Sequence, residues 1–200
     1  MLAHFGGLIK QVKEHAQQYF QTLVDLILHL WNTVALRPAL LPLILITSNI
    51  TKLDQLRNEV IPKLLPLVLN MFESASSPDD EGLQHQIQIL NILVKFGTVA
   101  EVYSQHIISI MTATLDQNSI SISLQKCLVN AIDQTIQKTN ISYNASHIVH
   151  SLVKALPEAR TEVCLAILNA LCSLAHQIGT DFLLFVPVIS AVCWASSFSL

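Results

Sequence analysis

Pairs of adjacent bulky residues recur along the chain at intervals of about 40 residues. The pairs are Tyr19-Phe20, Val60-Ile61, Ile107-Ile108, Ile148-Val149 and Phe185-Val186, and the intervals between them are 41, 47, 41 and 37 residues. After each pair, apolar residues continue at spacings of three and four, which is the periodicity of one face of an α-helix. A polar turn follows most of these segments. The recurrence therefore predicts stacked helical hairpins that bury one another's apolar faces.

A period of this length is typical of HEAT and armadillo repeats, so we expect an all-α fold. Antiparallel helices in such folds stack into a right-handed α-solenoid, and the pattern here predicts about ten of them. Strands are not expected, because no segment between turn signals alternates with a period of two. Residues 1–200 are expected to form a single array of about four repeats plus partial ends, since no linker or low-complexity tract interrupts the pattern.

The expected helices follow the periodic segments and their punctuation by proline and glycine. They cover residues 2–13, 15–31, 36–48, 53–72, 81–96, 99–115, 121–138, 144–156, a segment that Pro157 opens and Gly179 ends, and 181–195. Gly97 is also expected to end a helix. Prolines within the pattern are expected at helix starts or at bends; they are Pro38 and Pro42 in 36–48, and Pro62 and Pro66 in 53–72.

The composition is unusually apolar for a soluble domain. Apolar residues make up 52% of the chain and charged residues only 12%, about half the usual charged share. A Leu/Ile-rich repeat protein is one interpretation. The other, which we favour, is a segment of a larger assembly, because residues 2–8 and 182–198 would form end faces without the polar caps that solenoids need.

Membrane insertion and secretion are not expected. The most apolar runs, 34–46, 163–175 and 183–195, all fall short of the ~20 residues that span a bilayer. The N-terminus places Lys10 and Lys13 after a short apolar start, which is not the order of a signal peptide. We therefore expect a cytoplasmic protein without a transmembrane segment.

No residue stands out as catalytic, cofactor-binding or metal-binding. The five glycines form no phosphate-cradling loop, and the eleven Lys and Arg residues are scattered in a chain of net charge −3, so nucleic-acid binding is not expected either. Asp79-Asp80-Glu81 could be a metal or general-base cluster, but after Ser77-Pro78 it is more typical of a helix N-terminus with acidic residues that match the helix dipole.

Histidines, cysteines and large aromatic residues have similarly structural interpretations. His147 and His150, at positions i and i+3, could share a metal, but a structural zinc site needs four ligands and His106 precedes His147 by one repeat of 41 residues. Cys127, Cys164, Cys172 and Cys193 lack CxxC spacing and are expected to be reduced core residues. Trp31 and Phe72 are expected to pack in the core or at helix ends rather than to form an aromatic binding cage.

Three stretches of the chain resemble the HEAT-repeat region of the target-of-rapamycin (TOR) protein kinases. They are residues 142–190, 83–111 and 5–31, and together they cover most of the sequence. The proline-rich part, 33–58, matches poorly. Several consecutive repeats in the same order carry the resemblance, which a single repeat would not.

The resemblance implies that the parent protein is a very large serine/threonine kinase. Its solenoids would hold it in dimeric complexes with raptor-like and Lst8-like subunits that couple nutrient state to growth. The chain would lie upstream of the FAT, rapamycin-binding and kinase domains, and no kinase catalytic motif maps onto it. Its apolar end, residues 193–200, suggests a fragment, a split gene model or a truncated product.

Three functions remain open at this point. A non-catalytic scaffold segment of a TOR kinase is favoured, bound to TOR complex subunits in the cytoplasm or at the cytosolic face of endomembranes. An unrelated HEAT-repeat adaptor, such as a transport receptor or phosphatase scaffold, is the alternative. An enzyme with a cryptic pocket between helices is the third.

Overall fold

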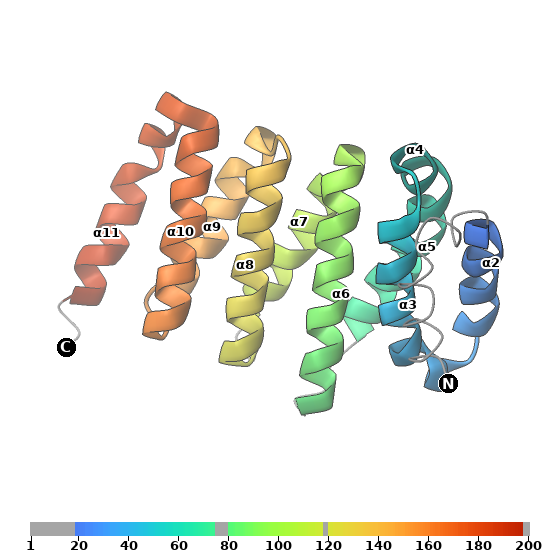
Figure 1. The fold of residues 1–200 in the computed structure, drawn as a ribbon. Helices are drawn as coiled ribbons and strands as arrows, with labels where there is room; N and C mark the ends of the chain where they lie inside the picture. The colour runs from blue at the N-terminus through green and yellow to red at the C-terminus, as the bar shows by residue number, and fades with distance from the viewer. Residues whose placement is uncertain (1–18, 75–79, 118–119, 198–200) are drawn as a thin grey trace. The chain divides into compact units, whose positions relative to one another are not determined.

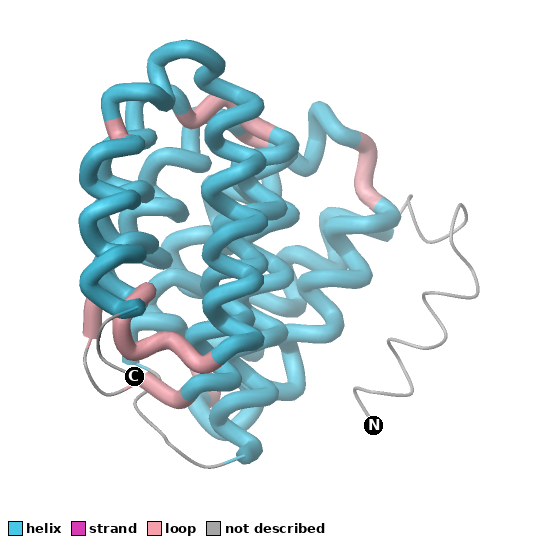
Figure 2. The backbone as a smooth tube through the Cα atoms, turned by 90° about the vertical axis from the view of Figure 1, so that its left-hand side faces the viewer, coloured by secondary structure: helices cyan, strands magenta, loops and turns pink. Residues whose placement is uncertain are grey.

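The computed structural model describes residues 19–74, 80–117 and 120–197. Every regular element in these ranges is helical and none is a strand (Figure 2), which confirms the all-α prediction. The helix expected over 2–13 and the turn at Ser77-Pro78-Asp79 lie outside the described residues. The chain divides into two compact units, residues 1–100 and 101–200, and each is described by itself. A single array over 1–200 stays a prediction.

The first unit is made of consecutive helices (Figure 1). Its elements are α2 (Phe20–Trp31), the 3-10 turn η2 (Val34–Leu36), α3 (Arg37–Ile50), α4 (Leu53–Gln55), the π-helical turn η3 (Leu56–Val60), α5 (Ile61–Ser74) and α6 (Asp80–Val99). Helix α3 packs against both α2 and α6, and α5 packs against α6. Trp31, the last residue of α2, and Phe72, in the last turn of α5, are buried as expected.

Prolines shape two of these helices. Pro38 lies in the first turn of α3, where its missing N–H would have no helical partner anyway, and Pro42 is tolerated inside the same helix. The irregularity expected at Pro62 occurs just before it, as the π-helical turn η3. There the N–H of Ile61 bonds to the carbonyl of Leu56, five residues back. Pro62 cannot donate to the next carbonyl in the series, so a wider turn adjoins it.

Gly97 does not end its helix, so that prediction was wrong. Helix α6 continues through Gly97 to Val99, and Ala100 closes it with an N–H bond to the carbonyl of Phe96. A glycine can remain in the right-handed helical conformation at a modest entropic cost. Gly97 is buried, so the packing of this end of the helix outweighs that cost.

The second unit stacks helices in two layers. Its elements are α7 (Glu101–Leu115), α8 (Ile122–Lys138), the 3-10 turn η4 (Ser142–Asn144), α9 (Ala145–Ala155), α10 (Thr161–Ile178), the 3-10 turn η5 (Gly179–Leu184) and α11 (Val186–Ser197). Helices α8 and α10 lie side by side in one layer, and α7, α9 and α11 follow one another in the other (Figure 1). Within this unit the stacked helical hairpins predicted from the periodicity are therefore present.

Most helix boundaries in the second unit match the predicted ones. Ser121 caps α8 by accepting the N–H of Leu124, as Ser residues at this position do. Gly179 ends α10 with φ at +61°, a conformation that favours glycine. The last predicted helix starts late, because η5 occupies residues 179–184 and α11 begins at Val186.

Pro157 does not open α10, which begins four residues later at Thr161. Pro157 instead occupies the second position of a turn in which the N–H of Ala159 bonds to the carbonyl of Leu156. Proline is favoured at that position because its φ is already set. Proline suits a β-turn and the first turn of a helix equally well, and at this position the β-turn forms.

The three internal pairs of bulky residues lie in the core. The buried members are Val60, Ile61, Ile107, Ile108, Ile148 and Val149, all at most 2% exposed. The first and last pairs differ. Tyr19 is 59% exposed beside a buried Phe20, and Val186 is 42% exposed.

One helical stretch among the described residues has the length and apolar character of a membrane span. Thr161–Leu184 combines α10 and η5, and a third of its most apolar window is buried inside the protein. Core helices of soluble proteins have the same length and composition, and α10 packs along α8. The stretch therefore gives no positive evidence for a transmembrane segment.

Candidate interaction surface

The histidines considered as metal ligands lie on the surface. His106 in α7 and His147 and His150 in α9 are all exposed. No group of three or more potential metal ligands occurs in the part of the chain that the structure describes. The side chains of Asp79, Asp80 and Glu81 lie outside the described residues, so their cap interpretation stays a prediction.

The four cysteines are thiols, as expected, but they are not core residues. Cys127 and Cys164 are half-buried, and Cys172 and Cys193 are exposed. The apolar runs that contain them face the core with other positions of the same helices, so a cysteine within such a run can still point outward. Partial burial raises the pKa of the Cys127 thiol, and the neighbouring Lys126 only partly offsets this effect.

Polar side chains link neighbouring hairpins of the second unit at one end of its helices. The Gln177 amide donates to the carbonyls of Ile136 at 2.8 Å and Thr139 at 2.5 Å, and its oxygen accepts the N–H of Ile141 at 3.3 Å. Glu101 accepts the N–H of Asn140 at 3.2 Å. These contacts satisfy backbone groups in the connection after α8, which would otherwise lack helical partners.

Further links run along the helices of the same unit. Lys126 and Glu162 form an ion pair of 2.7 Å between α8 and α10, and this contact lowers the pKa of the Glu162 carboxyl. Gln137 donates to Ser173 at 3.3 Å, eleven residues further along each helix. Because both contacts join residues 36 positions apart, α8 and α10 run parallel and in register.

A groove with two protruding apolar side chains opens between the start of α7 and η4. It has a volume of about 410 Å³ and is lined by Glu101, Val102, Gln105, Asn140 and Tyr143. Val102 is 87% exposed and Tyr143 is 88% exposed. Sequence reasoning missed both residues, because nothing in the local pattern separates them from core positions.

Helix α10 presents apolar residues on both of its sides. Its buried stripe, from Val163 to Leu174, is the counterpart of the stripe from Leu124 to Thr135 on α8 at an offset of 39 residues. Lys126 pairs with Glu162 of α10, and Val129, three residues further along α8, is fully buried. At the same offset, α10 carries Leu165 and Leu168, which remain exposed.

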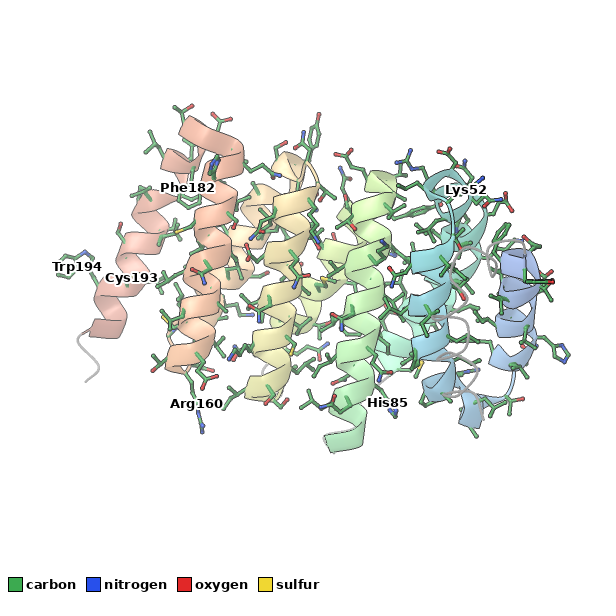
Figure 3. The ribbon with its side chains drawn as sticks, in the orientation of Figure 1. Lys52, His85, Arg160, Phe182, Cys193 and Trp194 are labelled. Atoms are coloured by element: carbon green, nitrogen blue, oxygen red, sulfur yellow. The ribbon has the colours of Figure 1, made fainter. Side chains whose placement is uncertain are left out.

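Helix α11 and the turn before it present a larger apolar surface. The terminal apolar face, as we call it, surrounds a hollow of about 420 Å³ and is formed by Phe182, Val186, Ile189, Ser190, Cys193 and Trp194. Trp194 is 67% exposed and points away from α11 into solvent (Figure 3). Exposed apolar patches of this kind mark contact surfaces. The sequence signalled this one, since residues 182–197 contain no charged residue.

Comparison with known proteins shows which proteins contain a segment similar to this chain. No family model matches the chain. TOR2 of Saccharomyces cerevisiae, a serine/threonine-protein kinase, is 30% identical over 186 residues, which cover 92% of this chain. The chain is homologous to one segment of the TOR kinases. The kinase tor1 of Schizosaccharomyces pombe is 27% identical over 64% of the chain, and the kinase TOR of Arabidopsis thaliana is 24% identical over 92%.

The homologous segment is a small part of each TOR kinase. This chain spans only 6% to 8% of the length of these three relatives. The match to TOR2 runs through both units, because an alignment over 92% of the chain leaves no room to omit either.

Proposed function

We propose that this chain is a non-catalytic, protein-binding scaffold segment of the HEAT-repeat region of a TOR kinase. The observation that carries this proposal is the homology to TOR2, which extends over 92% of the chain and only 7% of the kinase. Stacked helical hairpins, joined by polar links between neighbours, supply a rigid surface on which other proteins can bind.

The partners of such a segment would be the rest of the kinase chain and the TOR complex subunits, including raptor-like and Lst8-like proteins. Its place would be the cytoplasm, or the cytosolic face of endomembranes through the complex. The groove beside Val102 and Tyr143 and the terminal apolar face are the surfaces on which contact is expected, because large exposed apolar side chains dominate the energetics of protein interfaces.

Co-purification from yeast cells tests this function. The tagged chain should recover the TOR kinase or its complex subunits above the level found with the tag alone. A matched pair of variants controls for folding: Ile148→Asp, which disrupts the core, should lose the partners, and Gln117→Asp, on an exposed turn residue, should keep them.

The identity of the recovered proteins decides between a TOR segment and an unrelated adaptor. Recovery of nuclear-transport cargo or phosphatase subunits, without TOR subunits, would contradict the proposal. The purified chain should also neither bind ATP in equilibrium dialysis nor transfer phosphate. Phosphoryl transfer needs a phosphate-cradling loop together with metal-binding and catalytic acidic side chains, so saturable ATP binding would contradict the non-catalytic assignment.

A further inference from the structure

The groove between the start of α7 and η4 combines two exposed apolar side chains with a carboxylate. Val102 is 87% exposed and Tyr143 is 88% exposed, and Glu101 lines the same groove of about 410 Å³. Large apolar side chains that gather at a groove in this way are typical of contact sites. The volume is enough for one side chain of a partner, so the chemistry of the walls indicates which side chain fits.

Hydrogen bonds hold the walls of this groove in place. Glu101 accepts the N–H of Asn140 at 3.2 Å through Oε1. Asn140 in turn accepts the N–H of Ser142 at 3.2 Å and the Ser142 hydroxyl at 2.7 Å, both through Oδ1. Tyr143 follows Ser142 directly, so these contacts fix the backbone that carries its ring. A groove that is ordered in advance loses less conformational entropy when a partner binds.

The groove carries a negative charge that no described cation neutralises. Among the side chains that line it, only Glu101 is charged. The two ion pairs of the described residues are Lys126–Glu162 and Lys154–Asp116, so neither involves this carboxylate. A carboxylate accepts hydrogen bonds at both of its oxygens, and the contact with Asn140 uses one of them. A cation is therefore the complementary group for this groove.

An arginine side chain matches every wall of the groove. Its planar guanidinium stacks on an aromatic ring such as that of Tyr143 and donates two parallel N–H bonds to a carboxylate such as that of Glu101. Its methylene groups can pack on Val102, and the amide oxygen of Gln105 can accept a further N–H. A lysine ammonium lacks the flat, forked geometry, and an apolar side chain would bury the carboxylate without a partner.

We propose that the groove lined by Glu101, Val102 and Tyr143 receives an arginine side chain presented by a partner protein. The proposal rests on the scaffold function, because it names the chemistry that one of the proposed contact surfaces recognises. It adds a requirement that the scaffold function alone does not make: the partner segment carries a guanidinium, and loss of either the Glu101 charge or the Tyr143 ring weakens the contact.

NMR titration of the purified full chain with N-acetyl-arginine amide tests the recognition directly. The backbone amide signals of Glu101, Val102 and Tyr143 should shift in a saturable manner. The citrulline analogue has nearly the same shape without the charge, and it should bind roughly tenfold more weakly. The lysine analogue carries the charge without the plane, and it should also bind more weakly.

Variants of the two walls assign the binding to the proposed contacts. Glu101→Gln removes the charge but keeps an oxygen that can accept the N–H of Asn140, and it should weaken arginine binding roughly tenfold. Tyr143→Ala should weaken it roughly threefold to fivefold, whereas Tyr143→Phe keeps the ring and should bind normally. Asp181→Asn removes an exposed carboxylate elsewhere in the same unit and is the matched control. Thermal melting checks that all four variants remain folded.

Co-purification separates failure of this proposal from failure of the scaffold function. If the tagged chain recovers TOR complex subunits and Glu101→Gln and Tyr143→Ala recover them equally well, the groove proposal is wrong and the scaffold function stands. If the unmodified chain recovers none, the scaffold function is wrong and the groove proposal falls with it.

Three results of the titration would also overturn the proposal. One is the absence of saturable shifts at the groove with the arginine probe. Another is equal binding of the arginine and citrulline probes. The third is equally tight binding of N-acetyl-leucine amide, which would show that the groove selects apolar side chains.

Discussion

Gln177 joins two hairpins through a single side chain. Its amide bonds to two carbonyls and one N–H in the connection after α8. We expect Gln177→Ala to lower the free energy of unfolding by roughly 1–2 kcal/mol, because each lost hydrogen bond of this kind contributes about 1 kcal/mol and water partly replaces it. Urea denaturation measures the change, and Gln134→Ala, at an exposed position of α8, is the control with little effect. Equal stabilities of the two variants would show that the link contributes nothing.

Ile148 belongs to the pair of bulky residues at the start of α9 and is fully buried. Ile148→Asp places a carboxylate where it can neither ionise in water nor find a partner, so we expect a loss of several kcal/mol or local unfolding. Gln117→Asp, on an exposed turn residue, should change stability by less than about 0.5 kcal/mol. Thermal denaturation followed by circular dichroism measures both. Similar melting temperatures would mean that the assigned core is wrong.

At the scale of single elements, Gly179 sets the end of α10. Its φ of +61° with ψ of −127° is accessible to glycine and strained for residues with a Cβ. No heavy atom lies within 4 Å of a Cβ built there, so the cost of Gly179→Ala is one of backbone strain alone. We expect a loss of about 1–3 kcal/mol in chemical denaturation, against little change for the neighbouring exposed Thr180→Ala. A neutral Gly179→Ala would indicate that the end of α10 relaxes without cost.

The helical periodicity of the sequence was sufficient to predict which helices form, but it predicted their boundaries less accurately. Helix α8 was placed within a residue of its observed start because apolar spacing and a capping serine agree there. The helix boundaries predicted from Gly97 and Pro157 were wrong, because glycine can lie inside a helix and proline suits a turn as well as the first turn of a helix. Each residue type permits two local structures, and packing with residues distant in sequence selects one.

The candidate surfaces were predictable only in part. An uncharged run over 182–197 indicated an uncovered apolar end, but Val102 and Leu168 could not be separated from core residues. Their exposure depends on which side of a helix lacks a neighbour. The same limit applies to Cys172, which lies within an apolar run and yet faces outward. Local spacing defines the stripe that faces the core, and the neighbouring elements decide whether the other side is covered.

At the scale of the whole molecule, ionic interactions have a small role. The ion pairs of the described residues are Lys126–Glu162 and Lys154–Asp116, and three of these four side chains are 44% exposed or more. Exposed pairs contribute little and are screened by salt. Raising the ionic strength from about 0.05 M to about 0.5 M should therefore change the unfolding free energy by less than about 1 kcal/mol. A larger salt-induced loss, measured by urea denaturation, would reveal stabilising charge interactions that these contacts do not account for.

The polar links between hairpins of the second unit also bear on how that unit folds. Gln177 with Ile136, Glu101 with Asn140, and Lys126 with Glu162 each join residues 36 to 41 positions apart. The entropy lost on closing a loop depends only on the logarithm of its length, so every closure of this size carries nearly the same entropic cost. No step in the assembly of the unit is then much harder than the one before it, and a nucleus formed at one hairpin can grow outward by the addition of one neighbour at a time.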